Sequence, residues 1–491
     1  MRKEGISEQI VHKKQGKIVS PLVDKLGDLL SITSWSVDRL PEYLWLALIL
    51  EHEGRDEGIL RCRSIIKRIM NCNERCESVQ MSQIFSLDDA LQRKVYSIIK
   101  SEVPIAALTP LTAVANMEYC PVFYEQFCCA SIGLNERIDI LNTVLRKYNE
   151  PNGDSAIDLK YLELLPLAWS GHYQFQENSP FADALLHYWE TPASEGIMSI
   201  YRSSIYSLEG CIAISDGRQS GWTKQFWNVL SRITDCRLSR ISYGKEAVKV
   251  DYTTFISKTK EALNYLNIQH KTDTLGDDYS VLVGSLAHSL KIFDEVIEHN
   301  LENTLIGRQV VRTLVEIYIM MKYLILKEKE KPDVWKQYKV YGIGKYKLIL
   351  MKLRDGIGSE ITHVSKNMLE LLVNEPQTEE LTDVDLKYFD DENIKAKAIL
   401  VGEKDLYDIA YDYDSNFTHA LWGAVRESSM LLCDNILHHF SPVPDAELSQ
   451  NLPDISKDCF IVIIKLLLMT NERYGFPEWY VTYLRRCHVQ V

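Results

Sequence analysis

The spacing of the apolar residues constrains the fold of this chain more than any other sequence feature. Apolar side chains recur at intervals of three and four residues over long stretches, which places them on one face of a helix. Alternating apolar and polar residues between tight turns, the pattern of β-strands, do not form a series anywhere in the sequence. The sequence therefore predicts an all-α fold, with an N-terminal helical array followed by a C-terminal helical bundle.

Polar residues, glycines and prolines interrupt this periodicity and predict where helices begin and end. Ser86 precedes Asp88 and Asp89, so a hydroxyl and two carboxylates stand where a helix exposes free N–H groups and the positive end of its dipole. A helix is therefore expected at 86–101. Further helices of the N-terminal array are expected at 43–53, 55–71, 135–148, 181–189 and 253–266. The glycine- and serine-rich stretch 210–222 predicts a loop.

The length of the chain, 491 residues, predicts two domains, because single hydrophobic cores stop growing at roughly 250–300 residues. The polar stretch 270–279, HKTDTLGDDY, has the composition of a linker. We therefore place the domains at 1–270 and 280–491. From 280 to 331 the periodicity continues without proline, which predicts one long helix or two helices in line. Later helical blocks are expected at 345–354, after a turn at 341–344, and then at 406–439 and 458–486.

The charge distribution is uneven in the C-terminal part. The net charge of −13 does not favour a protein whose whole surface attracts nucleic acid or anionic lipid, but it is compatible with a local basic patch. Basic residues outnumber acidic ones from 309 to 354, and the stretch 375–414 is strongly acidic. Two interpretations stay open: a phosphate-binding surface gated by the acidic part, or two solvated faces.

Cysteine usage and hydropathy indicate a cytoplasmic protein without a membrane span. The first 17 residues are polar and lack the apolar stretch of a secretory signal. The most apolar stretch, 459–469, contains Lys465 and is much shorter than the ~20 residues that cross a bilayer, so we expect a buried helix there. The eleven cysteines are scattered, and many lie in apolar runs, which is typical of reduced core thiols.

Three charged residues in the stretch that follows the connector predict a polar stripe on one helix. Arg308, Arg312 and Glu316 are spaced by four, so they share a helix face. Their neighbours are apolar, and burying charges is costly unless they are paired. The stripe is therefore either a structural ion-pair network or the floor of a site.

A second set of candidate residues lies around His419 in the sequence. If this stretch is helical, Tyr411, Ser415, His419 and Trp422 share one face. An imidazole beside a hydroxyl and a phenol, facing a helix that offers Arg and Glu, supplies the acid, base and anion-binding groups of phosphodiester or acyl chemistry. A hydrogen-bonded core histidine is the alternative interpretation.

Over 280–440 the chain resembles bacterial helical domains grouped with abortive-infection proteins of the HEPN-like type. The residues that carry the resemblance are Arg312, Glu316, Tyr323, Trp335, Tyr338, Tyr411, Ser415 and His419. The resemblance implies a helical bundle, often a dimer, and in active members a metal-independent ribonuclease whose Arg and His bind and cleave the RNA backbone. Those members carry Arg and His a few residues apart on one helix. Residues 412–418 hold no arginine, so Arg312 would have to act from another helix.

These observations lead to the hypothesis of an anti-phage or stress effector that acts on RNA. Its catalytic residues would be Arg312, His419 and Glu316, with the histidine as general acid or base. Its substrate-binding residues would be Arg308, Tyr411, Ser415 and Trp422. A homodimer through the C-terminal bundle and a protein partner for the N-terminal domain are also expected.

Two alternatives belong to other functional classes. The first is a non-catalytic scaffold in which the Arg, Glu and His side chains form a buried polar network. The second is a nucleotide or small-ligand sensor that uses the loop at 216–222. No metal site and no cofactor are expected: Cys72 and Cys76 lack a second ligand pair, and Gly342-Ile343-Gly344-Lys345 lacks the rest of a phosphate-binding loop.

Overall fold

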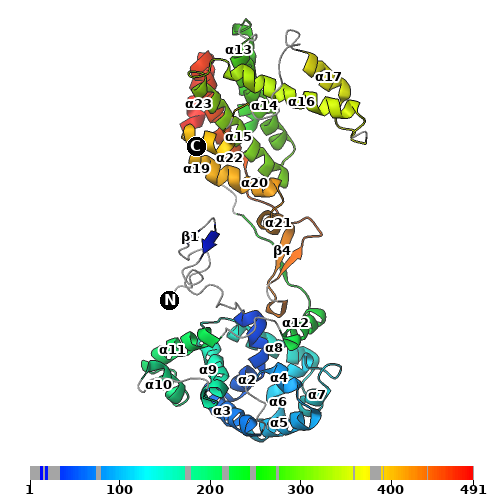
Figure 1. Ribbon diagram of the computed structural model, residues 1–491, viewed down its shortest axis with the longest axis vertical. Coiled ribbons are helices and arrows are strands. Elements are labelled where there is room, and N and C mark those ends of the chain that lie inside the picture. The colour runs from blue at the N-terminus through cyan, green and yellow to red at the C-terminus, as the bar shows by residue number, and fades with distance from the viewer. Residues whose placement is uncertain are drawn as a thin grey trace. The chain divides into compact units, whose positions relative to one another are not determined.

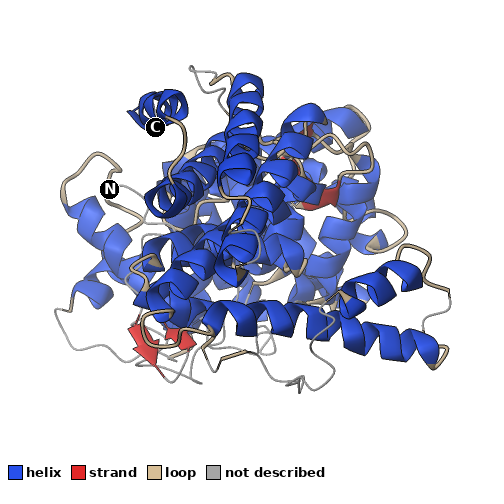
Figure 2. Cartoon of the chain, turned by 90° about the horizontal axis from the view of Figure 1, so that it is seen from above, coloured by secondary structure: helices blue, strands red, loops and turns tan. Residues whose placement is uncertain are grey.

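Helices make up most of the described chain in this computed structural model, as Figure 2 shows, and the all-α prediction is confirmed. The structure describes residues 12–14, 17–19, 34–72, 79–171, 179–212, 220–243, 250–272, 276–357, 360–375, 389–390, 392–438 and 441–489. The strands in these ranges are short: β1 (His12–Lys14), β2 (Lys17–Val19), β3 (Leu238–Ser239), β4 (Met430–Cys433) and β5 (Pro442–Pro444). β1 and β2 are antiparallel, and β3 pairs with β4 in the register Leu238 to Cys433.

The chain divides into two compact units, and unit 1 is built from two separate stretches of sequence. Unit 1 comprises Met1–Ser239 and Leu432–Ser441, and unit 2 comprises Arg240–Leu431 and Pro442–Val491. The sequence-based boundary at 270–280 therefore lies one helix too late. The helix α13 (Tyr252–Gln269) packs on α14 (Asp277–Glu298) and α23 (Glu478–Val489) of unit 2, and its Phe255 and Leu266 are fully buried there. The stretch predicted as a connector, 270–279, therefore lies within unit 2, and its last residues already belong to α14, which begins at Asp277.

The core of unit 1 surrounds two helices that are buried along most of their length, α2 and α9. Its helices are η3 (Trp35–Arg39), α2 (Leu40–Glu53), α3 (Arg55–Cys72), α4 (Met81–Phe85), α5 (Asp89–Glu102), α6 (Ile105–Leu108), η4 (Thr109–Ala113), α7 (Pro121–Phe127), α8 (Leu134–Tyr148), α9 (Asp154–Trp169), α10 (Pro180–His187), α11 (Ile197–Ile212), α12 (Gly221–Ile233) and η7 (Ile436–His438). The helices predicted in this half are confirmed within a few residues. The Asp88 carboxylate caps α5 by accepting from Leu91 N, so this helix begins at Asp89 and not at Ser86.

Charged side chains enter the core of unit 1 from α9. The Lys160 ammonium donates to Glu209 at 2.7 Å, and the Arg39 guanidinium donates to Glu163 at 2.8 Å and also contacts Glu209. Lys160 and Glu209 are each only 3 % exposed, and the Lys160 Nζ atom lies 4.8 Å from the centre of the Trp35 ring. Charges so deeply buried are tolerated when each has an opposite partner, which this network provides.

The core of unit 2 is formed mainly by α14, α15 and α22. Its helices are α13 (Tyr252–Gln269), α14 (Asp277–Glu298), α15 (Leu305–Lys327), α16 (Val334–Arg354), α17 (Lys366–Asn374), α18 (Ile394–Leu400), α19 (Lys404–Leu406), η6 (Tyr407–Tyr411), α20 (Asp412–Thr418), α21 (Trp422–Ser429), α22 (Ser456–Tyr474) and α23 (Glu478–Val489). Figure 1 shows that α16 and α17 form a pair that projects from this bundle.

Three boundaries in unit 2 differ from the prediction. The stretch 280–331 contains two helices that pack against each other, because Asn300 adopts a φ of 53° and turns the chain after α14. Asparagine tolerates this left-handed conformation better than most residues. The expected turn at 341–344 is helical and lies inside α16, and the block expected at 406–439 ends as a helix at Ser429 and continues as β4.

Gly307 fixes the start of α15 through a close approach of the backbone. A Cβ atom at this position would lie 2.6 Å from Leu301 O and 3.1 Å from Ile455 Cγ1. We expect Gly307→Ala to lower the free energy of unfolding of unit 2 by about 1–3 kcal/mol, because a fixed carbonyl must move. Urea denaturation measures the change. Gly284→Ala is the matched control: nothing lies within 4 Å of its Cβ in the middle of α14, so it should raise the same quantity by about 0.5–1 kcal/mol. Similar losses in both variants would contradict this account.

Candidate functional site

A groove in unit 2 lies between α14, α15 and α16 and has a volume of about 830 Å³. Ser285 and His288 line it from α14, and Arg312 and Glu316 line it from α15. The side of the groove formed by α16 carries several tyrosines and lysines. A volume of this size falls in the range of ligand-binding clefts, roughly 300–1,000 Å³.

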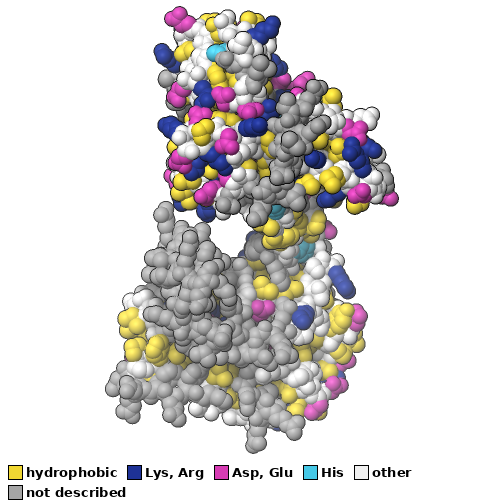
Figure 3. Space-filling model, turned by 45° about the horizontal axis from the view of Figure 1, so that its top comes forward, with side chains coloured by type: hydrophobic (Ala, Val, Ile, Leu, Met, Phe, Trp, Pro, Cys, Tyr) yellow, Lys and Arg dark blue, Asp and Glu magenta, His cyan; other side chains and the backbone are white. Residues whose placement is uncertain are grey.

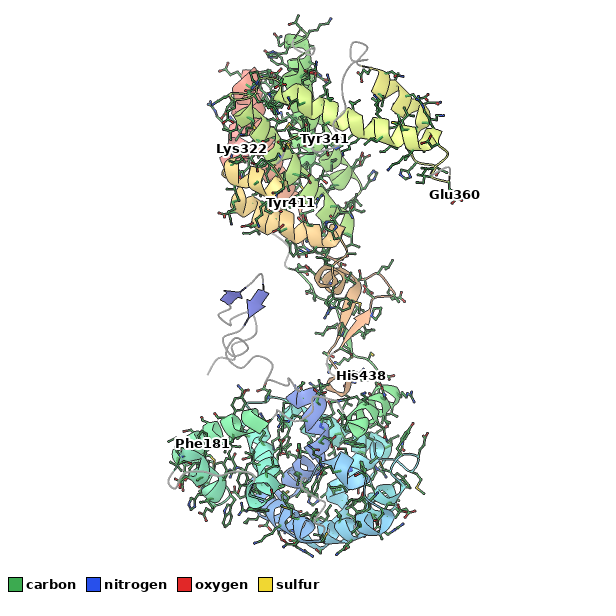
Figure 4. The ribbon with its side chains drawn as sticks, viewed as in Figure 1. Phe181, Lys322, Tyr341, Glu360, Tyr411 and His438 are labelled. Atoms are coloured by element: carbon green, nitrogen blue, oxygen red, sulfur yellow. The ribbon has the colours of Figure 1, made fainter. Side chains whose placement is uncertain are left out.

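The α16 side of the groove is basic and aromatic. This helix carries six basic residues and no acidic ones: Lys336, Lys339, Lys345, Lys347, Lys352 and Arg354. Lys339 and Lys345 line the groove together with Tyr338, Tyr341 and Tyr346. Figure 3 shows Lys and Arg side chains on the projecting pair, and Figure 4 shows Tyr341 on α16. Lysines that alternate with tyrosines on a groove wall combine positive charge with flat surfaces for stacking.

Four of the predicted site residues meet at Arg312. The Arg312 Nε donates to Ser415 Oγ at 3.1 Å, Nη2 donates to Tyr411 Oη at 2.7 Å, and Nη1 lies 3.4 Å from Glu316 Oε2. The guanidinium also lies over the Tyr411 ring, 4.6 Å from its centre, and Tyr411 itself stacks on Tyr407. The spacing of four places Glu316 beside Arg312, and the packing of η6 and α20 on α15 brings Tyr411 and Ser415 to them. Figure 4 shows Tyr411 in the segment that leads into α20.

The surroundings of Glu316 keep two phenols neutral. Burial, together with the Glu316 carboxylate, raises the pKa of Tyr411, although Arg312 acts in the opposite direction. Burial and Glu316 also raise the pKa of Tyr338 on the other side of the groove. At neutral pH both phenols therefore keep their protons, and the groove presents Arg312 as a cation and Glu316 beside it.

His419 does not take part in this arrangement. It follows the last residue of α20 as its cap, is exposed, and is absent from the groove lining. Within the described ranges its imidazole has no hydrogen bond or ion pair. The histidine that lines the groove with Arg312 is His288. The spacing of Ser280, Gly284 and His288 by four on α14 was the sequence signal for this polar face.

Arg308 and Trp422 also lie outside the groove. Arg308 is 6 % exposed, donates through Nη2 to Pro453 O at 2.8 Å, and lies over the ring of Phe417. It therefore stabilises the packing of α15 and cannot bind a substrate from solvent, which corrects its predicted role. Trp422 begins α21 and is 64 % exposed.

Unit 1 contains a cluster of metal-ligand type that the sequence interpretation missed. Cys236, Cys433 and His438 offer ligand atoms that all lie within 4.8 Å of one another. The His438 Nδ1 atom lies 3.4 Å from each of the two Sγ atoms. Four residues separate Cys433 from His438 in the sequence. Cys236 is distant along the chain, so no local motif revealed the set.

Several predicted features fall outside the described residues. These are Cys76, most of the loop at 216–222 that was considered as a ligand sensor, and most of the acidic stretch after Glu375. Among the helices that the structure describes, none combines the length and the apolar character needed to cross a membrane.

Comparisons with known proteins cover only part of the chain. Residues 279–435 match the model of a family described as "Family of unknown function (DUF5677)". Searches of curated proteins and of solved structures find no match. The matched range begins in α14 and contains all residues that line the groove. The groove is therefore part of the region that this chain shares with the family, whose description names no activity.

Proposed function

We propose that unit 2 binds single-stranded RNA in the groove between α14, α15 and α16. The observation that carries this proposal is the composition of the α16 wall, where Lys339 and Lys345 alternate with three tyrosines. Bases stack on tyrosine rings without regard to sequence, and lysines attract the phosphates between them. Unstacked bases are accessible in single strands, which favours them over a duplex.

The charge balance inside the groove supports an anionic ligand. Arg312, Lys339 and Lys345 oppose the single carboxylate of Glu316 among the groove-lining side chains. Lys339 also pairs with Asp277 at the exposed rim, 3.1 Å away, and a phosphate can replace a partner at such a solvated site. The strongly negative net charge of the whole chain then acts against binding elsewhere on the surface.

Fluorescence anisotropy with a labelled uridine oligonucleotide tests this binding. The double variant Lys339→Ala/Lys345→Ala should weaken binding about tenfold or more at low salt, and it should reduce the slope of log K against log salt by about 1.4. Tyr346→Ala, which removes an exposed ring from the groove, should weaken binding roughly fivefold or more through lost stacking.

The matched control is Lys457→Ala on α22, an exposed lysine outside the groove. This variant should keep the affinity and the salt dependence of the wild type. Equal affinities of the wild type and the double lysine variant would sink the binding proposal. Tighter binding to a duplex of the same length would contradict the choice of single strands.

We further propose that this groove cleaves the RNA that it binds, without a metal ion. Glu316 accepts the proton of a ribose 2′-hydroxyl, and the 2′-oxygen then attacks the adjacent phosphorus. Arg312 stabilises the negative charge that develops on the phosphoryl oxygens, and His288 donates a proton to the departing 5′-oxygen. His288 thus takes the role that the sequence assigned to His419. A role in phage defence stays a prediction from the resemblance.

Cleavage is tested with a labelled RNA in the presence of a chelator. We expect Arg312→Ala, Glu316→Gln and His288→Ala to lose cleavage, and His419→Ala to retain it, with helical circular dichroism unchanged in all four. An oligonucleotide with 2′-deoxyribose should bind without being cut. Intact RNA at high concentrations of wild-type protein would remove the cleavage step and leave the binding proposal standing.

A scaffold role is the second candidate, and the Arg312 network favours it. Arg312 links α15 to Tyr411 and Ser415, so its side chain also holds two segments of unit 2 together. If this is its whole role, Arg312→Ala lowers the melting temperature and leaves RNA affinity unchanged. Arg312→Lys then recovers little stability, since a lysine cannot reproduce the two directed hydrogen bonds.

A further inference from the structure

We infer that Cys236, Cys433 and His438 of unit 1 bind one zinc ion. The two cysteines come from segments that β3 and β4 bring together, with Leu238 opposite Cys433 in the register. His438 lies at the end of η7, which follows β4. Thiolate and imidazole groups are the ligands that zinc prefers in proteins.

Backbone contacts hold the cluster in place. Asp434 N donates to Arg237 O at 2.9 Å, and the side-chain amide of Asn435 donates to the backbone carbonyl of Asp235 at 3.0 Å. Cys433 N donates to Ser441 O at 3.0 Å. The ligand-bearing segment is therefore fastened on both sides of Cys433, and the positions of the ligand atoms are set by the fold.

The hydrogen bond at the far side of the imidazole selects the tautomer of His438. The Thr234 hydroxyl donates to Leu230 O at 2.6 Å, so its oxygen is left to accept from His438 Nε2, which lies 2.8 Å away. The proton of the neutral ring therefore resides on Nε2, and Nδ1 carries a lone pair. This lone pair faces both cysteine sulfurs, which is the orientation of a metal-binding histidine fixed by a second partner.

The distances fit a tetrahedral ion. Zinc binds sulfur at about 2.3 Å and imidazole nitrogen at about 2.0–2.1 Å, so two such ligands in a tetrahedron lie about 3.6 Å apart. The His438 Nδ1 atom lies 3.4 Å from Cys236 Sγ and 3.4 Å from Cys433 Sγ. Two thiolates would also balance the charge of the ion. Because Cys236 is exposed, water can reach the fourth position.

A bound ion would join the two stretches of sequence that make up unit 1. Cys236 lies just before the point where the chain leaves unit 1, and Cys433 lies just after the point where it returns. The ion would therefore close the loop formed by residues 240–431 and stabilise the return segment, whose Ile436 and Leu437 are buried in the core of unit 1.

The test is the metal content of the full chain, purified through a tag without histidines from a medium that contains zinc. Elemental analysis should find about one zinc ion per chain. The metal-free protein should also take up cobalt and develop the absorption band of a cobalt–thiolate bond. Cys433→Ser and His438→Ala should each weaken zinc binding about tenfold or more in a competition with a chelating dye.

Cys236→Ser is the variant that distinguishes loss of a zinc ligand from loss of folding. Cys236 is exposed, so its substitution leaves the core intact, as circular dichroism can verify. Cys129→Ser, a change at another cysteine of unit 1 that lies outside the cluster, should keep the zinc. Wild-type protein with less than about a tenth of an equivalent of zinc and no cobalt–thiolate band overturns the inference. A disulfide between Cys236 and Cys433 in protein purified under reducing conditions overturns it as well.

Discussion

Glu209→Gln is expected to lower the free energy of unfolding of unit 1 by about 3–5 kcal/mol. The Glu209 carboxylate accepts from the Lys160 ammonium and contacts Arg39, and both Lys160 and Glu209 are almost completely buried. Arg39 keeps its second partner, Glu163, in the variant. Lys160 loses its partner and stays in an apolar environment, where an unpaired charge is strongly destabilising.

Urea denaturation followed by tryptophan fluorescence measures this effect. Glu125→Gln is the matched control in the same unit, since Glu125 pairs with Arg93 at the surface, where the two side chains are 45 % and 49 % exposed. The control should change stability by less than about 1 kcal/mol. Adding Lys160→Met to Glu209→Gln should restore part of the loss, because the unpaired ammonium is removed. A loss in Glu209→Gln no larger than that of the control would contradict the role of the network.

Asp414→Asn is expected to stabilise unit 2 above neutral pH and to have little effect in acid. The Asp414 side chain is 2 % exposed, and burial raises its pKa to about 7, against the partial opposition of Arg308. The usual aspartate pKa is 3.8. Between these two values the folded chain holds a proton that the unfolded chain releases, so stability falls as pH rises from 4 to 7 and then levels off. The full difference is up to about 4 kcal/mol.

Thermal or urea denaturation of the variant and the wild type across pH 4–8 gives the difference directly. Asp445→Asn supplies a control of opposite sign in the same unit. The pKa of Asp445 is lowered: burial opposes this, but hydrogen bonds from Gln450 N and the Ser449 hydroxyl to the carboxylate prevail. The wild type should therefore gain stability over Asp445→Asn as pH rises from acid. A pH-independent difference for Asp414→Asn would refute the assignment of its proton.

Local periodicity predicted most of the helices because each depends on residues near in sequence. The ends of α14 and α16 were predicted less well. Asn300 ends α14 through its own backbone conformation, and nothing in the apolar pattern marks that turn. Gly342 and Gly344 suggested a turn, but both lie inside α16, a helix that packs against α14 and α17. Tertiary contacts override the weak local preference of glycine in such positions.

The candidate site was predictable where it depended on spacing along one helix. Arg312 and Glu316 are neighbours on α15, and Tyr411 and Ser415 are four residues apart in the segment of η6 and α20. The contact of Tyr411 and Ser415 with Arg312, however, depends on the packing of this segment on α15. The helical spacing that placed His419 on the same face as Tyr411 and Ser415 does not extend to this residue, because α20 ends at Thr418.

The remaining site residues depend on pairing between distant segments. His288 reaches the groove because α14 packs on α15, and Cys236 approaches Cys433 because β3 pairs with β4. Neither pairing is encoded in a local pattern. Information on long-range contacts was therefore required to find the basic groove wall and the cysteine cluster.

The discontinuous construction of unit 1 bears on how the protein is synthesised. Ile436 and Leu437 occupy the core of unit 1, yet they are translated only after all of residues 240–431. On the ribosome, the first 239 residues therefore lack part of their core while residues 240–431 are synthesised. A nascent chain that stalls before Ser441 exposes the unfilled part of this apolar core. Chaperones and proteases can therefore recognise a chain that lacks the late segment.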